Sequence, residues 1–374
     1  MKKLAVIGAN EPLECFYKQA RKLGYYLIGI AYEKGAVCKK YCDVFYPISF
    51  MDKEAVLDVC RKEKIDGIIS FSLESALSTV TYVAQSLNLV SNSYECLELT
   101  STKYAQREAF KKNGICVPKY YLLKDKRDLL GIDITFPVIL KPIDSGGSQG
   151  VIKVDNCDQL ENAYNYAVKH SRTSSVIVEE FIDGREFSVE HISYEGKHYL
   201  LQITDKVTSG APHFIEMQHH QPANIDTLLY RKIEDLVSRA LDALQIENSA
   251  SHTELKLNSK GELYIIEIGA RMGGDFIASD LVYLSTGYDF VRGVIELSMG
   301  NFIKPELCQS KYSGVYFYSR LAPYVREYIE NSMLYPEIKE CQVTDEILPE
   351  VCSNADRGGY LIYQSEAGKW EINR

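Results

Sequence analysis

The chain has 374 residues, of which 46% are hydrophobic and 25% are charged, and its formal net charge is −9. This composition fits a folded protein of two or three domains, and the acidic balance argues against a sequence-independent nucleic-acid binder, which needs a basic surface. The apolar run at the N-terminus is too short for a signal peptide, and no stretch reaches the length of a membrane span. We therefore expect a cytoplasmic protein that acts on small molecules, without nucleic-acid or membrane partners.

Ten cysteines are scattered along the chain, and none forms a CxxC pair. Structural zinc sites and the disulfide frameworks of small secreted proteins usually show closely spaced cysteines. The sequence therefore predicts neither of these features and favours a reduced compartment.

The first hundred residues alternate between strand-like and helix-like segments. Strands are expected at 3–8, 26–31 and 67–70, and helices at 11–23 and 54–63. This alternation predicts a parallel sheet. Only Gly8 remains of the GxGxxG pattern that a dinucleotide site would carry after the first strand. An NAD-dependent oxidoreductase is therefore disfavoured, and we expect a Rossmann-like domain that faces substrate or is purely structural.

A domain boundary is predicted near residue 100, where a helix begins at 99–103 and ends near Gly114. A mixed α+β region follows. A helix in it begins at Asp155 or Asn156, and strands are expected at 138–142, 151–154, 176–182, 187–193 and 198–203. Strand-like stretches at 314–318 and 359–364 predict a small C-terminal lobe. The expected domains are 1–100, 101–300 and 301–374.

A glycine-rich segment follows the apolar run that ends at Lys141. Its glycines let backbone N–H groups approach an anion, and its serines add hydroxyl donors. The donors are those of Ser145, Gly146, Gly147, Ser148 and Gly150. The segment is not a Walker A loop, because GxxxxGK[ST] is missing and a strand follows it. It is either a flap over a bound phosphate or a flexible hairpin tip.

A second apolar strand ends in the acidic pair Glu179 and Glu180. The next residues, Phe181 and Ile182, could offer an apolar slot and backbone hydrogen bonds to an adenine, with Glu186 within reach of a ribose. The alternative interpretation of the acidic pair is a solvated strand end.

Residues 251–268 have the pattern of a β-hairpin with a turn at 258–261. Pairing Leu257 with Glu262 would place Glu254 opposite Ile265. Period two then predicts that one face carries His252, Glu254, Lys256, Leu263, Ile265 and Glu267.

On that face Glu254 and Glu267 are expected to be diagonal neighbours, roughly 7 to 8 Å apart at Cα, and able to hold Mg²⁺ between them. A one-residue slip in register would instead turn Glu267 outward. Arg271 follows the second strand and could stabilise developing negative charge, while Gly273 and Gly274 could present N–H groups to a substrate carboxylate.

This order of motifs resembles the ATP-grasp superfamily of carboxylate–amine ligases, over about residues 100–300, with a Rossmann-like region before it. The resemblance implies that Lys103 and Lys141 contact ATP phosphates. It implies that Glu180 and Ile182 hold adenine through their backbone and that Glu186 binds the ribose.

The same resemblance implies that Glu254 and Glu267 ligate Mg²⁺ and that Arg271 stabilises the transition state. Many members of the superfamily carry a further asparagine ligand where this chain has Gly269. One or two Mg²⁺ ions are therefore expected, and Mn²⁺ could substitute.

Further residues are predicted to bind the substrate. Lys206 and His220 lie in a histidine-containing stretch that, by the resemblance, is near the acceptor site, although a lone histidine is more often structural. Neither His213 nor His219 has convincing metal-ligand spacing to an acidic partner. His252, on the face of the predicted metal pair, is the better candidate.

We expect a ligase that converts a carboxylate to an acyl phosphate and then forms an amide or peptide bond, with an amino-acid substrate. The alternatives are another ATP-grasp reaction, such as a purine-pathway or carbamoyl-phosphate-like step, and a non-catalytic nucleotide-binding regulatory protein. A homodimer is compatible with the sequence.

Overall fold

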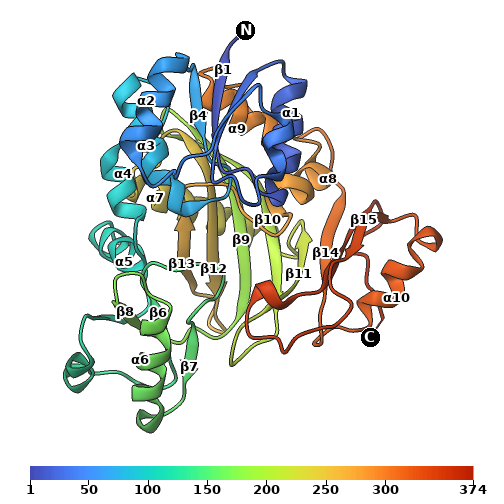
Figure 1. Cartoon of the computed structure of the whole chain (residues 1–374). Helices are drawn as coiled ribbons and strands as arrows, with labels where there is room; N and C mark the ends of the chain where they lie inside the picture. The colour runs from blue at the N-terminus through green and yellow to red at the C-terminus, as the bar shows by residue number, and fades with distance from the viewer. Residues whose placement is uncertain (374) are drawn as a thin grey trace.

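The computed structural model describes residues 1–373, and within that range the strands form three β-sheets. Figure 1 shows the N-terminal sheet and its helices in blue at the top, a small sheet in green at the lower left, and a large sheet through the centre. The large sheet continues into the orange and red C-terminal strands at the right.

The N-terminal sheet is parallel, with strand order β3-β2-β1-β4. Its strands are short apolar runs covered by helices, as parallel sheets require. The strands are β1 (Lys3–Ile7), β2 (Tyr26–Ile30), β3 (Val44–Tyr46) and β4 (Gly67–Ile69). The helices are α1 (Glu14–Lys22), α2 (Lys53–Glu63), α3 (Leu77–Leu87) and α4 (Tyr94–Thr100). The predicted parallel sheet is thus confirmed, and β3 is a strand that the sequence pattern did not reveal.

The small sheet is antiparallel, with strand order β5-β8-β6-β7. It contains β5 (Tyr120–Leu123), β6 (Val138–Pro142), β7 (Ile152–Val154) and β8 (Val176–Glu180). Helix α6 (Leu160–Lys169) buries Ala163, Tyr164 and Ala167 against this sheet. The helix begins after Asn156 through a 3₁₀ turn, close to its predicted start. The glycine-rich segment connects β6 to β7, at the tip of this sheet.

The large sheet has the strand order β13-β12-β9-β10-β11-β14-β16-β15. Helix α7 (Thr227–Ala243) covers one face, and α9 (Phe290–Ser298) packs between the other face and the N-terminal sheet. Its strands are β9 (Arg185–Tyr194), β10 (Lys197–Thr208), β11 (Glu216–Gln221), β12 (Ser249–Leu257), β13 (Leu263–Gly269), β14 (Tyr312–Tyr318), β15 (Ile338–Val343) and β16 (Gly359–Ser365).

The C-terminal strands both extend the large sheet and enclose a core of their own. Tyr316 and Tyr363 pack there with Ile329 of α10 (Val325–Glu330) and with Trp370. Residues beyond 300 are therefore continuous with the central sheet through β11 and β14. The boundaries at 100 and 300 stay predictions.

None of the helices in residues 1–373 combines the length and the apolar character that crossing a bilayer requires.

The β12–β13 hairpin differs from its predicted register. Leu257 pairs with Leu263 rather than with Glu262, and a bulge at Ile266 places Glu254 directly opposite Glu267. Bulges of this kind re-aim side chains next to functional sites. The predicted diagonal arrangement is therefore wrong, although the two carboxylates do share one face.

Leu263 and Ile265 were predicted on the same face as the carboxylates, but they lie on the opposite face of the hairpin. Ile265 pairs with Leu255, and both are fully buried in the core beneath α7. Leu263 packs against the same core. The prediction that Leu263 and Ile265 share the face of the carboxylates is corrected, because pairing Leu257 with Leu263 instead of Glu262 turns both to the core face. The bulge at Ile266 then returns Glu267 to the face of Glu254.

Candidate active site

A cavity of about 400 Å³ lies between the glycine-rich segment of the small sheet and one face of the large sheet. It brings together most of the residues predicted from the sequence. Those that line it are Lys103, Lys141, Ser145, Gly146, Gly147, Ser148, Glu179, Glu180, Phe181, Ile182, Glu186, Lys206, His252, Glu254, Glu267, Arg271 and Gly274. Three predicted residues, Gly150, His220 and Gly273, are not part of its wall.

The β6–β7 segment is shaped for close approach to a ligand. Nothing lies within 4 Å of where a side chain at Gly146 or Gly147 would project, so this tip is open. Gly150 closes the segment at a φ of +73°, where a Cβ atom would lie only 2.7 Å from His170, so no side chain fits. The base is fixed by the Asp144 carboxylate, which accepts from the backbone N–H of Thr173 at 2.9 Å.

A buried carboxylate lies between two cations beside this segment. Glu179 is 2.6 Å from Lys141 Nζ and 2.6 Å from Arg107 Nε, and Arg107 is fully buried. Burial alone raises the pKa of Glu179, but Arg107 and Lys141 outweigh it and lower the pKa to about 2. Burial lowers the pKa of Lys141. The three groups form a compact positive unit facing the cavity.

Lys103 joins the same end of the cavity from the first turn of α5 (Lys103–Lys112), which Thr102 caps by accepting from Ala105 N–H. Its Nζ donates to the Ser145 carbonyl at 2.7 Å and contacts Glu267 Oε1 at 2.9 Å. Arg107, one turn later on this helix, is a site residue that the sequence analysis missed.

Glu254 and Glu267 present their carboxylates to the cavity from paired positions of β12 and β13. Carboxylate oxygens are the ligands that Mg²⁺ prefers, so the donor chemistry fits this ion. Each carboxylate is balanced by a lysine, because Glu254 Oε1 lies 2.7 Å from Lys206 Nζ and Glu267 contacts Lys103. Burial raises the pKa of Glu254, but Lys206 and His252 outweigh it and hold the pKa well below its usual range.

Lys206 is the centre of a second charged group. Its side chain is 2% exposed, and Nζ lies 2.7 Å from Glu216, 2.7 Å from Glu254 and 3.4 Å from Glu186. Burial lowers the pKa of Lys206, but the carboxylates outweigh it and hold the pKa well above its usual range. One cation therefore serves three acidic side chains.

His252 reaches the cavity from β12 with Glu190 behind it. The fully buried Glu190 carboxylate contacts His252 Nδ1 and accepts the Gly273 N–H at 3.2 Å. The predicted role of Gly273 is thereby corrected, since its N–H is directed to Glu190 rather than to a substrate. A side chain at this position would meet His252 Nδ1 at 2.6 Å, which explains the glycine.

His220 is not a substrate residue in this structure. It is buried in the C-terminal core, where Nδ1 lies 2.9 Å from Tyr363 Oη and Nε2 lies 3.0 Å from Gln218 Oε1. Its neighbour His219 lies on the opposite side of β11, with Nε2 3.3 Å from Glu216 Oε2. The residue that sequence reasoning set aside is thus the one beside the cavity.

Arg271 lines the cavity and connects it to the N-terminal domain. Its Nη1 donates to the Met272 carbonyl at 2.9 Å, and Nη2 lies 3.4 Å from Glu74 Oε2. Its Nε has no hydrogen-bond partner among the described residues and is buried. The guanidinium therefore retains a donor for a ligand.

Comparison with known proteins agrees with this geometry. Residues 134–280 match the model of the ATP-grasp domain. The chain is 25% identical over 212 residues to a D-alanine–D-alanine ligase B of Pseudomonas putida, covering 53% of this chain and 64% of the relative. It is 26% identical over 250 residues to an alanine–anticapsin ligase of Bacillus subtilis, covering 60% and 52% respectively. The chain thus spans between about half and two thirds of the length of these curated relatives.

A solved structure extends the similarity to nearly the whole chain. The L-amino acid ligase from Bacillus licheniformis superposes with a TM-score of 0.83 at 25% identity, covering 98% of this chain and 94% of that one. The predicted fold class is confirmed, a Rossmann-like domain followed by an ATP-grasp fold. ATP-grasp enzymes in general use ATP and Mg²⁺.

Proposed function

This chain contains an ATP-grasp domain, and on that premise we propose that it is an ATP-dependent carboxylate–amine ligase acting on an amino acid. One observation carries the proposal. Glu254 and Glu267 face each other across the hairpin in the same cavity as the glycine-rich segment, Lys103 and Lys141. A protein that only binds a nucleotide would not need this pair of carboxylates as Mg²⁺ ligands.

The nucleotide would lie under the β6–β7 segment, with Lys103 and Lys141 near its phosphates. Phe181 and Ile182 follow β8 and line the cavity, which suits an adenine slot, and Glu186 is placed beyond them for a ribose. The main-chain groups of Glu180 are the proposed adenine contacts. Glu179 itself is bound to Lys141 and Arg107, so we propose that it orients Lys141 rather than touching the base.

The proposed reaction has two steps. A carboxylate oxygen attacks the γ-phosphorus of ATP and ADP leaves, which gives an acyl phosphate. An amine nitrogen then attacks the acyl carbon, phosphate leaves, and the nitrogen loses a proton. Mg²⁺ held by Glu254 and Glu267 would neutralise charge on the phosphates.

The protein's own side chains contribute position and charge. Lys103, Lys141 and Arg271 face the cavity and would balance the charge on the transferring phosphoryl group. Gly269 lines the cavity without a side-chain ligand, so we propose one firmly held Mg²⁺. A second Mg²⁺ ion, and replacement of Mg²⁺ by Mn²⁺, are the alternatives to test. The partners are a small-molecule acid and amine, and cytoplasmic location and homodimer formation stay predictions.

The amino-acid substrate is supported by the names of the ligases that this chain resembles. A purine-pathway or carbamoyl-phosphate-like reaction is the alternative. ADP release measured over the common amino acids, singly and in pairs, distinguishes them, because only a ligase of the proposed class responds to an amino acid or a pair.

The decisive variant is Glu267→Gln, which keeps the shape but removes one carboxylate from the metal pair. We expect amine-dependent ADP release to fall at least about a hundredfold, or ~2.7 kcal/mol, while ATP binding persists. Glu262→Gln, at the exposed turn of the same hairpin, is the matched control and should keep full activity. Unchanged turnover in Glu267→Gln would overturn the metal assignment.

A further inference from the structure

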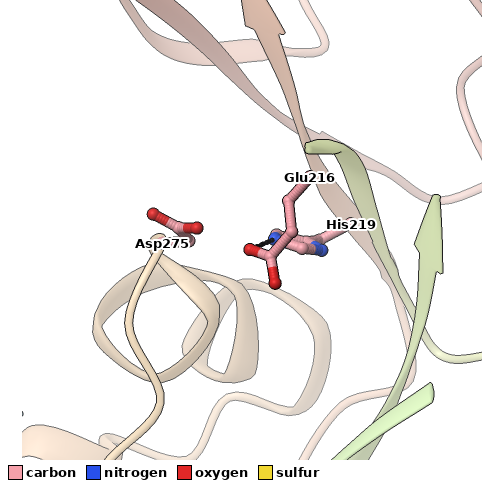
Figure 2. A group of neighbouring side chains, drawn as sticks. All are labelled: Glu216, His219 and Asp275. Carbon is pink, nitrogen blue, oxygen red and sulfur yellow. Dashed lines mark ion pairs between the residues drawn. The ribbon is translucent and has the colours of Figure 1, made fainter. Parts of the chain in front are cut away.

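One corner of the cavity holds three side chains that the reaction above does not use. Glu216 and Asp275 line the cavity, His219 lies beside them, and their ligand atoms all lie within 4.8 Å of one another. Figure 2 shows Glu216 and His219 on β11 and Asp275 facing them from the segment after β13. This set is called the acceptor corner below.

His219 adds an imidazole ring to the two carboxylates of the corner. It is fully buried, and neither ring nitrogen makes a hydrogen bond within residues 1–373. Nε2 lies 3.3 Å from Glu216 Oε2, without the angle of a hydrogen bond. A buried polar group without a partner is costly, so this ring is suited to meet a ligand.

Asp275 is held in place from the C-terminal region. Arg357 contacts its carboxylate with both terminal nitrogens, at 2.6 and 3.0 Å, and stacks on Phe317 with the guanidinium carbon 3.8 Å from the ring centre. Asp275 and Phe276 are consecutive non-glycine residues with φ of 51° and 65°. Such backbone is retained where surrounding structure enforces it, often at functional sites.

The C-terminal region also orients Glu216. The Asn354 side-chain oxygen accepts the Glu216 backbone N–H at 3.0 Å, and Asn354 lines the cavity. Asn354 and Arg357 both belong to the connection between β15 and β16. They are positioning residues for the corner.

The charges around the corner select among cations. Lys206 is 2.7 Å from Glu216 Oε1, and Arg357 engages Asp275, so each carboxylate has one cation already. A divalent metal would face both of these positive charges at short range. A carboxylate oxygen can still accept a further hydrogen bond, and a neutral imidazole nitrogen can accept one. Three converging acceptors match the three N–H donors of an ammonium group.

We propose that Glu216, His219 and Asp275 bind an ammonium group of the amino-acid substrate. This rests on the proposed function and deepens it, because it makes recognition of the amino acid depend on β11 and on the β15–β16 connection. The ammonium can be the α-ammonium or one on the side chain.

A panel of related acids separates these two sources. Caproate carries no ammonium, norleucine only the α-ammonium, ε-aminocaproate only the terminal one, and lysine both. We would measure ADP release by the full chain with each acid, with its des-amino or N-acetyl counterpart for every amino acid active in the screen. A second amino acid active in the screen is present throughout as the amine, so loss of response on removing one ammonium from the acid identifies which group the corner binds.

The variants are Asp275→Asn and His219→Gln, with thermal melting to verify folding. We expect the KM for the ammonium-bearing substrate to rise at least tenfold and the KM for ATP to stay within twofold. Asp280→Asn is the control, since this carboxylate lies one turn further on, bonds to Ser279 and does not line the cavity. If His219→Gln does not fold, Glu216→Gln replaces it, with the same expected rise in KM.

The outcomes are distinguishable. No ADP release by the unaltered protein with any acid overturns the proposed function together with this inference. Release with unchanged KM values in all three corner variants overturns only the inference. Zn²⁺ binding by calorimetry that is lost in His219→Gln and kept in Glu267→Gln would replace the ammonium with a metal.

Discussion

The two charged groups of the cavity are built in opposite ways. Beside the glycine-rich segment, one carboxylate, Glu179, lies between Lys141 and Arg107. Beside β11, one cation, Lys206, lies among carboxylates that include Glu216 and Glu254. The first group has an excess of positive charge and the second an excess of negative charge.

Each group is complementary to the charge that it is proposed to receive. Phosphates would approach the positive group, and Mg²⁺ and an ammonium the negative one. The two groups also differ in how far the partners of the central residue are exposed. Arg107 and Lys141 are 0 and 6% exposed, whereas the carboxylate partners of Lys206 are 14 to 26% exposed and open to the cavity.

The largest effect on stability is expected from replacing Glu179, the carboxylate of the positive group. In Glu179→Gln, Arg107 and Lys141 are left as buried like charges without their counterion. We expect the free energy of unfolding to fall by about 3 kcal/mol, the usual cost of breaking a buried ion pair from one side. Thermal and urea denaturation would measure it.

Glu161→Gln is the control, because it removes one partner of an exposed ion pair with Lys126. Such surface pairs contribute about 1 kcal/mol or less. Equal stability losses in the two variants would contradict the enclosed state of Glu179.

The second effect is the acid sensitivity of the same carboxylate. Its pKa is about 2 in the folded protein against 4.5 ordinarily, because Arg107 and Lys141 overcome the effect of burial. A lowered folded-state pKa contributes stability that is present above pH 4.5 and lost as the pH falls toward 2. The shift corresponds to roughly 3 kcal/mol.

Stability measured from pH 6 to pH 2 tests this, with the two proteins compared at each pH. The difference between the unaltered protein and Glu179→Gln should shrink through that range. A difference that stays constant down to pH 2 would contradict the lowered pKa, because it would show that Glu179 has the same pKa in the folded and the unfolded protein.

The smallest effect is expected from replacing Lys206, the cation of the negative group, and concerns the affinity for a metal ion. Lys206→Met removes the cation that competes with a metal for Glu254, so Mn²⁺ should bind more tightly, by about tenfold, on the order of 1.4 kcal/mol. Electron paramagnetic resonance of free Mn²⁺ measures the affinity. Lys260→Met, at the exposed hairpin turn, should leave it unchanged. Weaker Mn²⁺ binding in Lys206→Met would show that the lysine supports the metal site.

The positive group was only half predictable from the sequence. Lys141 and Glu179 are the first charged residues after apolar runs near the ends of β6 and β8, which marks strand ends facing a site. Arg107 was missed because its partner is 72 positions away. A signal was nevertheless present, since Lys103, Gln106 and Arg107 recur at helical spacing on α5 and all three are buried. Buried polar residues on one helical stripe indicate a partner.

The negative group shows the limit of strand periodicity. Period two from the predicted pairing of Leu257 with Glu262 placed Glu254 and Glu267 on one face, but the strands pair one residue further on, which turns Ile265 to the core. Glu267 shares the face of Glu254 only because the bulge at Ile266 restores it. Nothing in an apolar strand sequence distinguishes a bulged residue from a paired one. His219 was set aside for lack of convincing spacing to an acidic partner, although Glu216 lies three residues before it. The third residue, Asp275, comes from a distant segment that only the tertiary fold brings to β11.

Helix α5 lies where the small and large sheets meet. Lys103 contacts the Ser145 carbonyl of the small sheet and Glu267 of the large one, and Arg107 contacts Glu179 and the Ile266 carbonyl in the same way. Gln106, between them, exchanges hydrogen bonds with the Ile268 backbone on the outer edge of β13.

Side chains from a single turn of α5 therefore connect the two sheets. Moving the small sheet away from the large one would break the contacts of Lys103 and those of Arg107 at the same time. A nucleotide phosphate that bonds to Lys103 would compete with Ser145 and Glu267 for the same ammonium group, so we expect ligand binding to weaken the contacts that Lys103 makes between the two sheets.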